Sequence, residues 1–372
     1  MATIRKRTLP SGKIVWLAGY VDGGGKRRFR QFPTRKEADG FLLQARTQVA
    51  AGVHTPDSVS PTVAEAAELW LKRCERDKLE RTTVLQYRGH LTHHIGPQLG
   101  AVKLSRLTVP LINEFADNLL TAGRSRVLVS RVMVSLSSIV TEAQRRGLVT
   151  ANNVRSAKPI RRSSREDARP DMPTREELKT IIDATPGQWR PLILTAIFTG
   201  LRGSELRGLL WDDVDLRKGV LHVRRRADRF NAFGPPKSKA GTRDIPLPPT
   251  LLITLKAWKL ACPNGPLGLV FPTVAGTVQG HANILHRCFW PLQEAAGITV
   301  PGKDGKPEAK FSLHALRHAA AALWIGQGLS PKRIQTLMGH ASIAQTFDQY
   351  GYLFEARDDE AALLAGVEKG LL

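Results

Sequence analysis

The spacing of apolar residues between positions 311 and 353 predicts three short helices in succession. After Ser312, which can cap a helix N-terminus, apolar residues recur on one helical face: Leu313, Leu316, Ala320 and Leu323. The pair Ser330-Pro331 begins a second helix, and Gly339 is its expected end. The third helix has apolar residues at i, i+4 and i+7: Ile343, Phe347 and Tyr350. Helices this short need a larger domain to pack on.

Residues 1–55 have a different pattern, which predicts a small sheet with one helix. Residues 13–20 and 26–32 are rich in β-branched and aromatic residues, with a glycine-rich turn between them. A helix is expected from Thr34 to about Ala51. The second strand interleaves basic and aromatic residues, and a small basic sheet can bind in a DNA groove. Its arginines are therefore candidate DNA contacts, although a solvated charged face gives the same pattern: Arg27, Arg28 and Arg30.

Residues 62–154 are predicted to form a separate bundle of about four helices. Thr62 and Glu65 have the spacing of a capping box, and further helical patterns cover about 81–94, 108–121 and 125–146. The expected helix ends are glycines: Gly96, Gly123 and Gly147. Residues 155–171 follow with six Lys/Arg, two prolines and few apolar side chains, which is typical of a basic linker.

A third domain, expected over 172–360, mixes helices with a β-hairpin. Residues 191–198 are almost entirely apolar and predict a buried helix that ends at Gly200. Residues 219–226 read as a strand, and 236–246 as a turn and a return strand with lysines at the tip. The fold class is thus multidomain and mainly α with small β-sheets: a small N-terminal α+β domain, a four-helix bundle, and a mixed, mainly-α C-terminal domain. Residues 361–372 form a tail.

Charge narrows the class of partner. The 372 residues include 55 Lys and Arg against 33 Asp and Glu, a net charge of +22. An excess this large favours a polyanion, most simply nucleic acid. The three cysteines are far apart and form no CxxC pair, so neither a disulfide framework nor a zinc site is indicated, and a reducing cytoplasm fits. We find no membrane-length apolar run and no signal peptide.

Several polar residues at helix ends are candidates for chemistry. Arg202 follows the helix-breaking Gly200, and Glu205 three residues later is placed to orient it, although a local salt bridge is the simpler explanation. His314 and Arg317 lie three apart on one helical face. His340 follows the end of the next helix, while Tyr350 alone reads best as a core aromatic.

In this order, these residues resemble the tyrosine recombinase (phage integrase) family. The matching stretches are Thr199-Gly-Leu-Arg202-Gly-Ser-Glu205-Leu206, Pro236-Lys-Ser-Lys-Ala-Gly-Thr-Arg243, His314-Ala-Leu-Arg317-His318, and Leu337-Met-Gly-His340 through Leu353. The resemblance implies a catalytic domain over 172–360, a core-binding bundle over 62–154, and an arm-type DNA-binding domain over 1–55. A type IB topoisomerase, a resolvase, or a non-enzymatic helix–turn–helix regulator remain alternatives.

The resemblance also implies the role of each residue. Arg202 and Arg317 bracket the phosphate, because two guanidinium groups bind its oxygens bidentately. Tyr350, ten residues after His340, attacks and forms a 3′-phosphotyrosyl bond, and Tyr352 is the weaker candidate. His314 acts as base or phosphate ligand, and His340 donates to a phosphate oxygen. Lys237 protonates the leaving 5′-oxygen, with Lys239 as the alternative.

By the same resemblance the enzyme integrates or excises a phage or mobile element through a Holliday junction. It uses no metal or other cofactor, since the phosphotyrosyl bond conserves the phosphodiester energy. Its expected partners are double-stranded attachment sites of core and arm type, three further copies in a tetramer, and a host bending factor or excisionase. The expected location is the bacterial cytoplasm, in association with the nucleoid.

Overall fold

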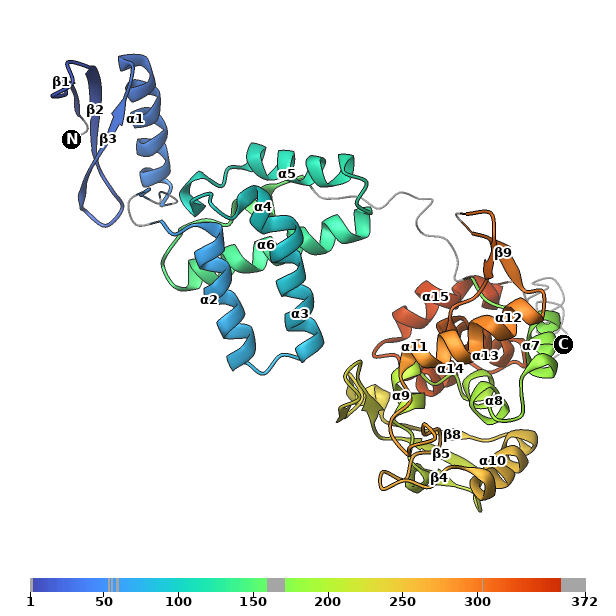
Figure 1. Cartoon of the computed structure of the whole chain (residues 1–372). Helices are drawn as coiled ribbons and strands as arrows, with labels where there is room; N and C mark the ends of the chain where they lie inside the picture. The colour runs from blue at the N-terminus through green and yellow to red at the C-terminus, as the bar shows by residue number, and fades with distance from the viewer. Residues whose placement is uncertain are drawn as a thin grey trace, which may run out of the picture. The chain divides into compact units, whose positions relative to one another are not determined.

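The computed structural model describes residues 3–52, 54, 56–57, 60–158, 171–302 and 304–355. The chain divides into two compact units, residues 1–167 and 168–372 (Figure 1). The mainly helical, multidomain class predicted above is confirmed. The finer division of the first unit at residues 55–62 stays a prediction, as does the tail, which lies outside the described residues.

The first unit begins with a three-stranded antiparallel sheet and one helix. The strands are β1 (Thr3–Thr8), β2 (Ile14–Val21) and β3 (Arg27–Phe32), in that order, and the helix is α1 (Arg35–Ala50). Thr34 caps α1, because its hydroxyl accepts the Glu37 N–H at 3.2 Å. The helix packs on one face of the sheet through a small core that includes Ala18, Ala38 and Leu42. β1 was not predicted, since its sequence has only one large apolar residue.

The helical bundle follows in the same unit. Its main helices are α2 (Val63–Arg76), α3 (Arg81–His90), α5 (Val109–Thr121) and α6 (Arg126–Arg145). The capping box at Thr62 and Glu65 is present, and both Gly123 and Gly147 have positive φ. The expected helix end at Gly96 is wrong: a π-helical turn (Leu91–Ile95) runs straight into α4 (Gly96–Leu99). Gly96 keeps helical backbone angles, and Pro97 is tolerated because it lies in the first turn of α4.

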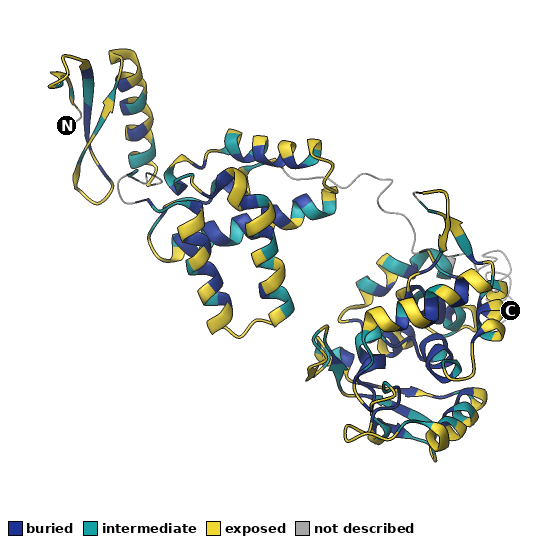
Figure 2. Cartoon of the chain, viewed as in Figure 1, coloured by how far each residue is buried: buried dark blue, intermediate teal, exposed yellow. Residues whose placement is uncertain are grey.

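The second unit is built around two buried helices, α8 (Arg190–Thr199) and α13 (Leu313–Gly326), which contact each other. Figure 2 shows both as largely buried. Further helices of this unit are α7 (Arg175–Ala184), α9 (Gly203–Arg207), α11 (His281–Ile284), α12 (Trp290–Ala295), α14 (Pro331–Met338) and α15 (Ile343–Glu355). Gly200 and Gly339 end α8 and α14 in the left-handed conformation, at φ +57° and +63°, as the sequence predicts.

A three-stranded sheet lies beside α10 (Pro249–Ala261) in this unit (Figure 1). Its strands are β4 (Val214–Asp215), β5 (Val220–Val223) and β8 (Arg243–Pro246), with β5 in the middle. Two further hairpins are small: β6 (Arg226–Ala227) with β7 (Phe233–Gly234), and β9 (Thr299–Pro301) with β10 (Pro307–Ala309). β9, β10 and α10 were not predicted from the sequence.

The predicted pairing of β5 with the return strand is confirmed, but its lysines are not at a tip. The chain first forms the β6–β7 hairpin, whose turn is fixed by the Asp228 carboxylate accepting the N–H groups of Phe230 and Ala232. Lys237 and Lys239 lie in the segment between β7 and β8, and Lys239 begins a 3-10 turn directly before β8. The sequence predicts a strand over 219–226, but it does not predict the β6–β7 hairpin that lies between β5 and β8.

Candidate active site

The corner between α8 and α9 holds Arg202. Because Gly200 turns the chain, Arg202 becomes the residue before α9 and its backbone N–H donates to the Glu205 carboxylate at 2.9 Å. Its guanidinium donates to the same carboxylate at 2.8 Å and to the Gly339 carbonyl at 3.1 Å. The Arg202 side chain remains 30% exposed. A charged group fixed on one side and open on the other can bind an anion from solvent.

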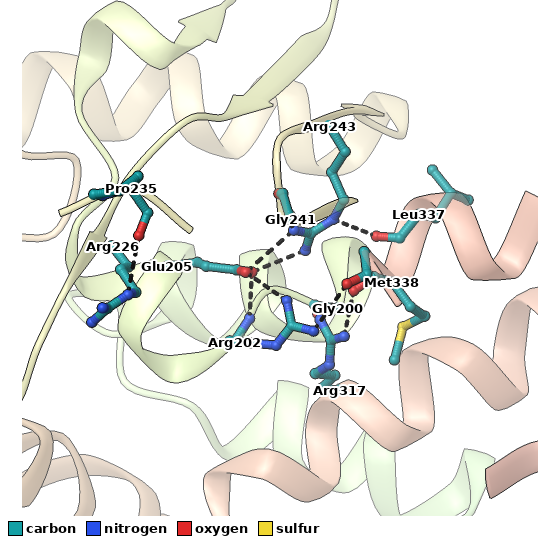
Figure 3. Close-up of polar contacts among 11 residues, drawn as sticks. Gly200, Arg202, Glu205, Arg226, Pro235, Gly241, Arg243, Arg317, Leu337 and Met338 are labelled. Carbon is teal, nitrogen blue, oxygen red and sulfur yellow. Dashed lines mark hydrogen bonds and ion pairs between the residues drawn. The ribbon is translucent and has the colours of Figure 1, made fainter. Parts of the chain in front are cut away.

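Glu205 is held between two arginines, and the second was missed by sequence reasoning. Arg243, at the start of β8, forms a bidentate pair with Glu205 at 2.9 and 3.2 Å, and donates to the carbonyls of Leu337 and Gly241 (Figure 3). Burial raises the pKa of Glu205 most, but the fields and hydrogen bonds of Arg243 and then Arg202 outweigh it and hold the pKa below its usual value. Glu205 therefore stays ionised.

Arg317 lies on α13 and is 3% exposed. Its guanidinium donates to the Gly200 carbonyl at 2.5 Å and to the Met338 carbonyl (Figure 3). These carbonyls lie at the ends of α8 and α14, where the helix dipole carries partial negative charge that stabilises a buried cation. Burial, and next the charge of Arg202, lower the pKa of Arg317 to about 9, so the group is still charged at neutral pH.

His340 and Tyr350 lie next to this cluster of arginines. His340 is 2% exposed, and its Nδ1 lies 2.9 Å from the hydroxyl of Thr346. Tyr350 is fully buried, and its ring stacks on His340 with 6.3 Å between centroids. Burial raises the pKa of the Tyr350 phenol to about 12, against the opposing charges of Arg317 and Arg202. Tyr350 is thus both a core aromatic, as its apolar stripe suggested, and a neighbour of the arginines.

The histidine that contacts the Tyr350 hydroxyl is His318. Its Nδ1 lies 2.8 Å from that oxygen, while His314, one helical turn earlier, is exposed and meets the His318 ring edge-on at 4.8 Å. Partial desolvation, and then its neighbours His318 and Arg317, lower the pKa of His314. His318 was quoted in the sequence motif but given no role. The i, i+4 spacing to His314 was the signal that it shares the face of α13.

The two lysines are less closely held. Lys237 and Lys239 are both exposed, and neither forms a side-chain hydrogen bond or ion pair with the residues that the structure describes. The segment they belong to nevertheless approaches the cluster. A Cβ on Gly339 would lie 2.9 Å from the Ala240 carbonyl oxygen, so Ala240 packs against the residue before His340. Lys239 is its direct neighbour, and Lys237 is two residues further away.

The three arginines of β3 do not share one face. Arg28 and Arg30 pair with Tyr20 and Ala18 of β2, on the face that α1 covers, whereas Arg27 lies on the opposite, open face. Arg28 forms a salt bridge with Asp22 at 2.8 Å, and Arg30 lies 3.5 Å from Asp57. The register places two other arginines on the open face with Arg27, together with a 57% exposed aromatic: Arg5, Arg7 and Phe29.

Over the described ranges we find no group of three or more His, Cys, Asp or Glu residues with the arrangement of a metal site. Likewise, none of the helices in those ranges is both long and apolar enough to cross a membrane. The acidic residue in the arginine cluster, Glu205, accepts hydrogen bonds from Arg202 and Arg243 on both of its carboxylate oxygens.

Comparison with known proteins shows which family has this arrangement of residues. The model of the phage integrase family matches residues 173–357, and that of the phage integrase N-terminal SAM-like domain matches residues 62–120. The putative prophage phiRv2 integrase of Mycobacterium tuberculosis is 27% identical, over 97% of this chain and 94% of its own length.

Two solved structures share the fold. The Tn1549 transposon integrase, in complex with a circular intermediate DNA, matches with a TM-score of 0.67 at 19% identity, over 83% of this chain and 99% of that one. A lambda integrase tetramer bound to a Holliday junction matches with a TM-score of 0.59 at 20% identity, over 91% and 95%. With the family models, these matches give the identity: the chain belongs to the phage integrase family and is a tyrosine site-specific recombinase.

Proposed function

We propose that this recombinase cuts and rejoins DNA at attachment sites with Tyr350 as its nucleophile, and so integrates or excises a phage or mobile element. The observation that supports it is the meeting of Arg202, Arg317, His340 and Tyr350 where α8 and α14 end. Arg202, Arg317 and the segment from His340 to Tyr350 are separated in sequence and come together in the folded unit.

Each side chain has a task in the proposed reaction. The Tyr350 oxygen attacks a phosphorus atom, the bond from phosphorus to the 5′-oxygen breaks, and a 3′-phosphotyrosyl bond forms. Negative charge grows on the non-bridging oxygens, and preorganised donors aimed at that charge lower the barrier. Arg202, Arg317 and His340 supply these donors, with His314 at the rim, while Glu205 holds Arg202 in place. By the family resemblance His314 acts as base or phosphate ligand.

The leaving 5′-oxygen needs a proton, which we assign to a lysine of the segment before β8. The sequence favoured Lys237. Ala240, next to Lys239, packs against Gly339, and Pro236, next to Lys237, packs against Gly241, so both lysines belong to a segment that approaches the cluster and both are candidates.

A Tyr350→Phe variant tests the nucleophile. It removes one oxygen from a buried ring and should still bind attachment-site DNA, yet form no covalent adduct on a nicked suicide substrate. Tyr352→Phe is the matched control, because it makes the same change two residues away on α15. Adducts from the Tyr350 variant together with their loss from the Tyr352 variant would move the nucleophile to Tyr352.

The N-terminal sheet is proposed as a second DNA contact, of arm type, through its open face. That face carries Arg5, Arg7 and Arg27 around Phe29, whereas Arg28 and Arg30 are engaged on the α1 side. Basic residues on an uncovered sheet suit phosphate binding. A fragment lacking residues 1–55 should cleave core sites and lose recombination that depends on distal sites; unchanged integration on full attachment DNA would refute the arm role.

Recombination joins two duplexes, and we propose a tetramer on a Holliday junction, in the cytoplasm where bacterial DNA lies. The tetrameric lambda integrase of the same fold supports the assembly. By the family resemblance, residues 361–372 are proposed to dock on a neighbouring copy and so link assembly to Tyr350; docking on their own domain is the alternative. Truncation after Phe354 should weaken synapsis and leave single-site binding intact. Synaptic complexes of normal yield on a native gel would exclude this docking. A host bending factor or excisionase remains a further expected partner.

A further inference from the structure

The hydroxyl of Tyr350 has one protein partner at hydrogen-bond distance among the described residues, the Nδ1 atom of His318, at 2.8 Å. We propose that His318 is the proton acceptor for Tyr350: its neutral ring takes the phenol proton as the oxygen attacks phosphorus. This inference rests on the proposed role of Tyr350 as nucleophile. It differs from the expectation that His314 supplies the base, since His314 contacts the His318 ring instead.

The surroundings of Tyr350 make a protein base necessary. The side chain has no exposed surface and packs among apolar residues of α13 and α14: Ala321, Ile325, Ile334 and Met338. A phenol is a poor nucleophile until it loses its proton, and burial makes this loss harder still. From this position bulk solvent cannot take the proton, whereas His318 already contacts the oxygen.

The groups around His318 keep its ring neutral and so able to accept a proton. His314 and Arg317 flank it on α13, His340 approaches after α14, and Tyr350 faces it from α15. Burial, and then the charge of Arg317, lower the pKa of His318, so the ring is neutral at neutral pH. A neutral ring has one nitrogen free to accept, and the proposal assigns this lone pair to Nδ1, facing the Tyr350 hydroxyl, and the hydrogen to Nε2.

The proposed step balances in both directions. During cleavage the Tyr350 O–H bond breaks, an N–H bond forms at His318 Nδ1, and the oxygen bonds to phosphorus as the 5′-oxygen leaves with a proton from the lysine. During rejoining a 5′-hydroxyl attacks and gives its proton back to the neutral lysine, the bond from phosphorus to the Tyr350 oxygen breaks, and imidazolium returns its proton to that oxygen. His314 is left free to bind the phosphate from the exposed rim.

The role of His318 as proton acceptor is tested by single-turnover cleavage. The full chain is mixed with a nicked suicide substrate that carries the core site of this recombinase. Loss of a general base costs on the order of 10²-fold or more in rate, so His318→Ala should cleave at least that much more slowly at neutral pH. The loss should shrink as the pH is raised, because a growing fraction of Tyr350 is then already ionised before it attacks. His286→Ala, an exposed histidine on another helix, is the control and should cleave at the wild-type rate.

Two further variants separate a base from a structural role. Asparagine at position 318 can accept the Tyr350 hydrogen bond but cannot take its proton, so His318→Asn should be as slow as His318→Ala; restored cleavage would reduce His318 to a positioning residue. A fluorinated, more acidic tyrosine incorporated at position 350 should shrink the His318→Ala loss. A loss that neither pH nor fluorination changes, a wild-type rate, or a faster rate would each overturn the proposal.

A measurement without DNA keeps the inference independent of catalysis. In the full chain labelled with ¹⁵N-histidine, the His318 signal, assigned with His318→Asn, should show hydrogen on Nε2 and a hydrogen-bonded lone pair on Nδ1. Tyr350→Phe should shift that Nδ1 signal. A hydrogen on Nδ1 in the wild-type chain would refute the proposal. Failure of the wild-type chain to form adducts would instead refute the proposed function, whatever the tautomer.

Discussion

Removing Arg243 should destabilise the second unit more than any change of a neighbouring surface charge. The Arg243 and Glu205 side chains are 1% and 2% exposed, and they form a bidentate pair. Arg243→Met keeps a long apolar side chain but leaves Glu205 with Arg202 alone, and leaves the Leu337 carbonyl without its 2.6 Å donor. We expect a protein that folds but has lost a buried ion pair.

The magnitude follows from burial. Breaking a buried pair by removing one partner costs about 3–5 kcal/mol, because the other charge stays desolvated. For a unit of this size each 1 kcal/mol lowers the melting temperature by roughly 2–4 °C, so the loss is on the order of 10 °C. Asp244→Asn is the matched control on the same strand. Asp244 is 66% exposed and pairs with His222, and surface pairs contribute at most about 1 kcal/mol.

Urea or thermal unfolding of the full chain, followed at the transition of the second unit, measures both variants. Glu205→Gln combined with Arg243→Met completes a double-mutant cycle, whose coupling free energy should be on the order of 1–3 kcal/mol. Equal and small effects of Arg243→Met and Asp244→Asn, with no coupling, would refute the reasoning. DNA cleavage should fall as well in Arg243→Met, because Glu205 no longer holds Arg202 in one orientation.

Three other predictions concern the DNA chemistry. Arg202→Ala and Arg317→Ala should each slow cleavage by a factor on the order of 10²–10³, measured by adduct formation, with a much smaller loss of DNA binding in a gel shift. A loss of binding as large as the loss of cleavage would argue against phosphate stabilisation. The variant of the true acid, Lys239→Ala or Lys237→Ala, should be rescued by a 5′-phosphorothiolate substrate, whose leaving group needs no proton, and rescue of neither would place the acid elsewhere. Arg5→Ala and Arg7→Ala should each reduce the salt slope of arm-site binding by about one, whereas Lys36→Ala on the helix α1 should not.

The sequence predicts those features that local signals specify. The capping box at Thr62, the proline after Ser330, and the left-handed glycines at 200 and 339 each fix a helix end through the nearest few residues, and the structure has all of them. Gly96 shows the limit of such signals. Glycine permits a helix end without requiring one, and packing of α4 on the bundle decides the outcome.

The features that the sequence did not predict depend on long-range contacts. Arg243 looks like one more charge on a hairpin, and only its register opposite Val223 and its contact with Leu337 turn it inward. His318 gains its partner from a helix 32 residues further along the chain. Three arginines on one strand looked like a single patch, although strand alternation separates Arg27 from the other two.

Acidification should destabilise the second unit through His340. Burial, and then the charges of Arg317 and Arg202, lower the pKa of His340 to about 4, against about 6.5 in an unfolded chain. Between pH 6.5 and about 4, His340 is therefore protonated in the unfolded state but not in the folded state, and the free energy of unfolding falls over this range. A shift of this size corresponds to about 3 kcal/mol. His340→Asn should lose correspondingly less stability over that range in urea titrations, whereas the exposed control His286→Ala should follow the wild type. Parallel stability curves for His340→Asn and the wild type would show that His340 is protonated equally in both states, and the buried, neutral ring assigned to the site would then be wrong.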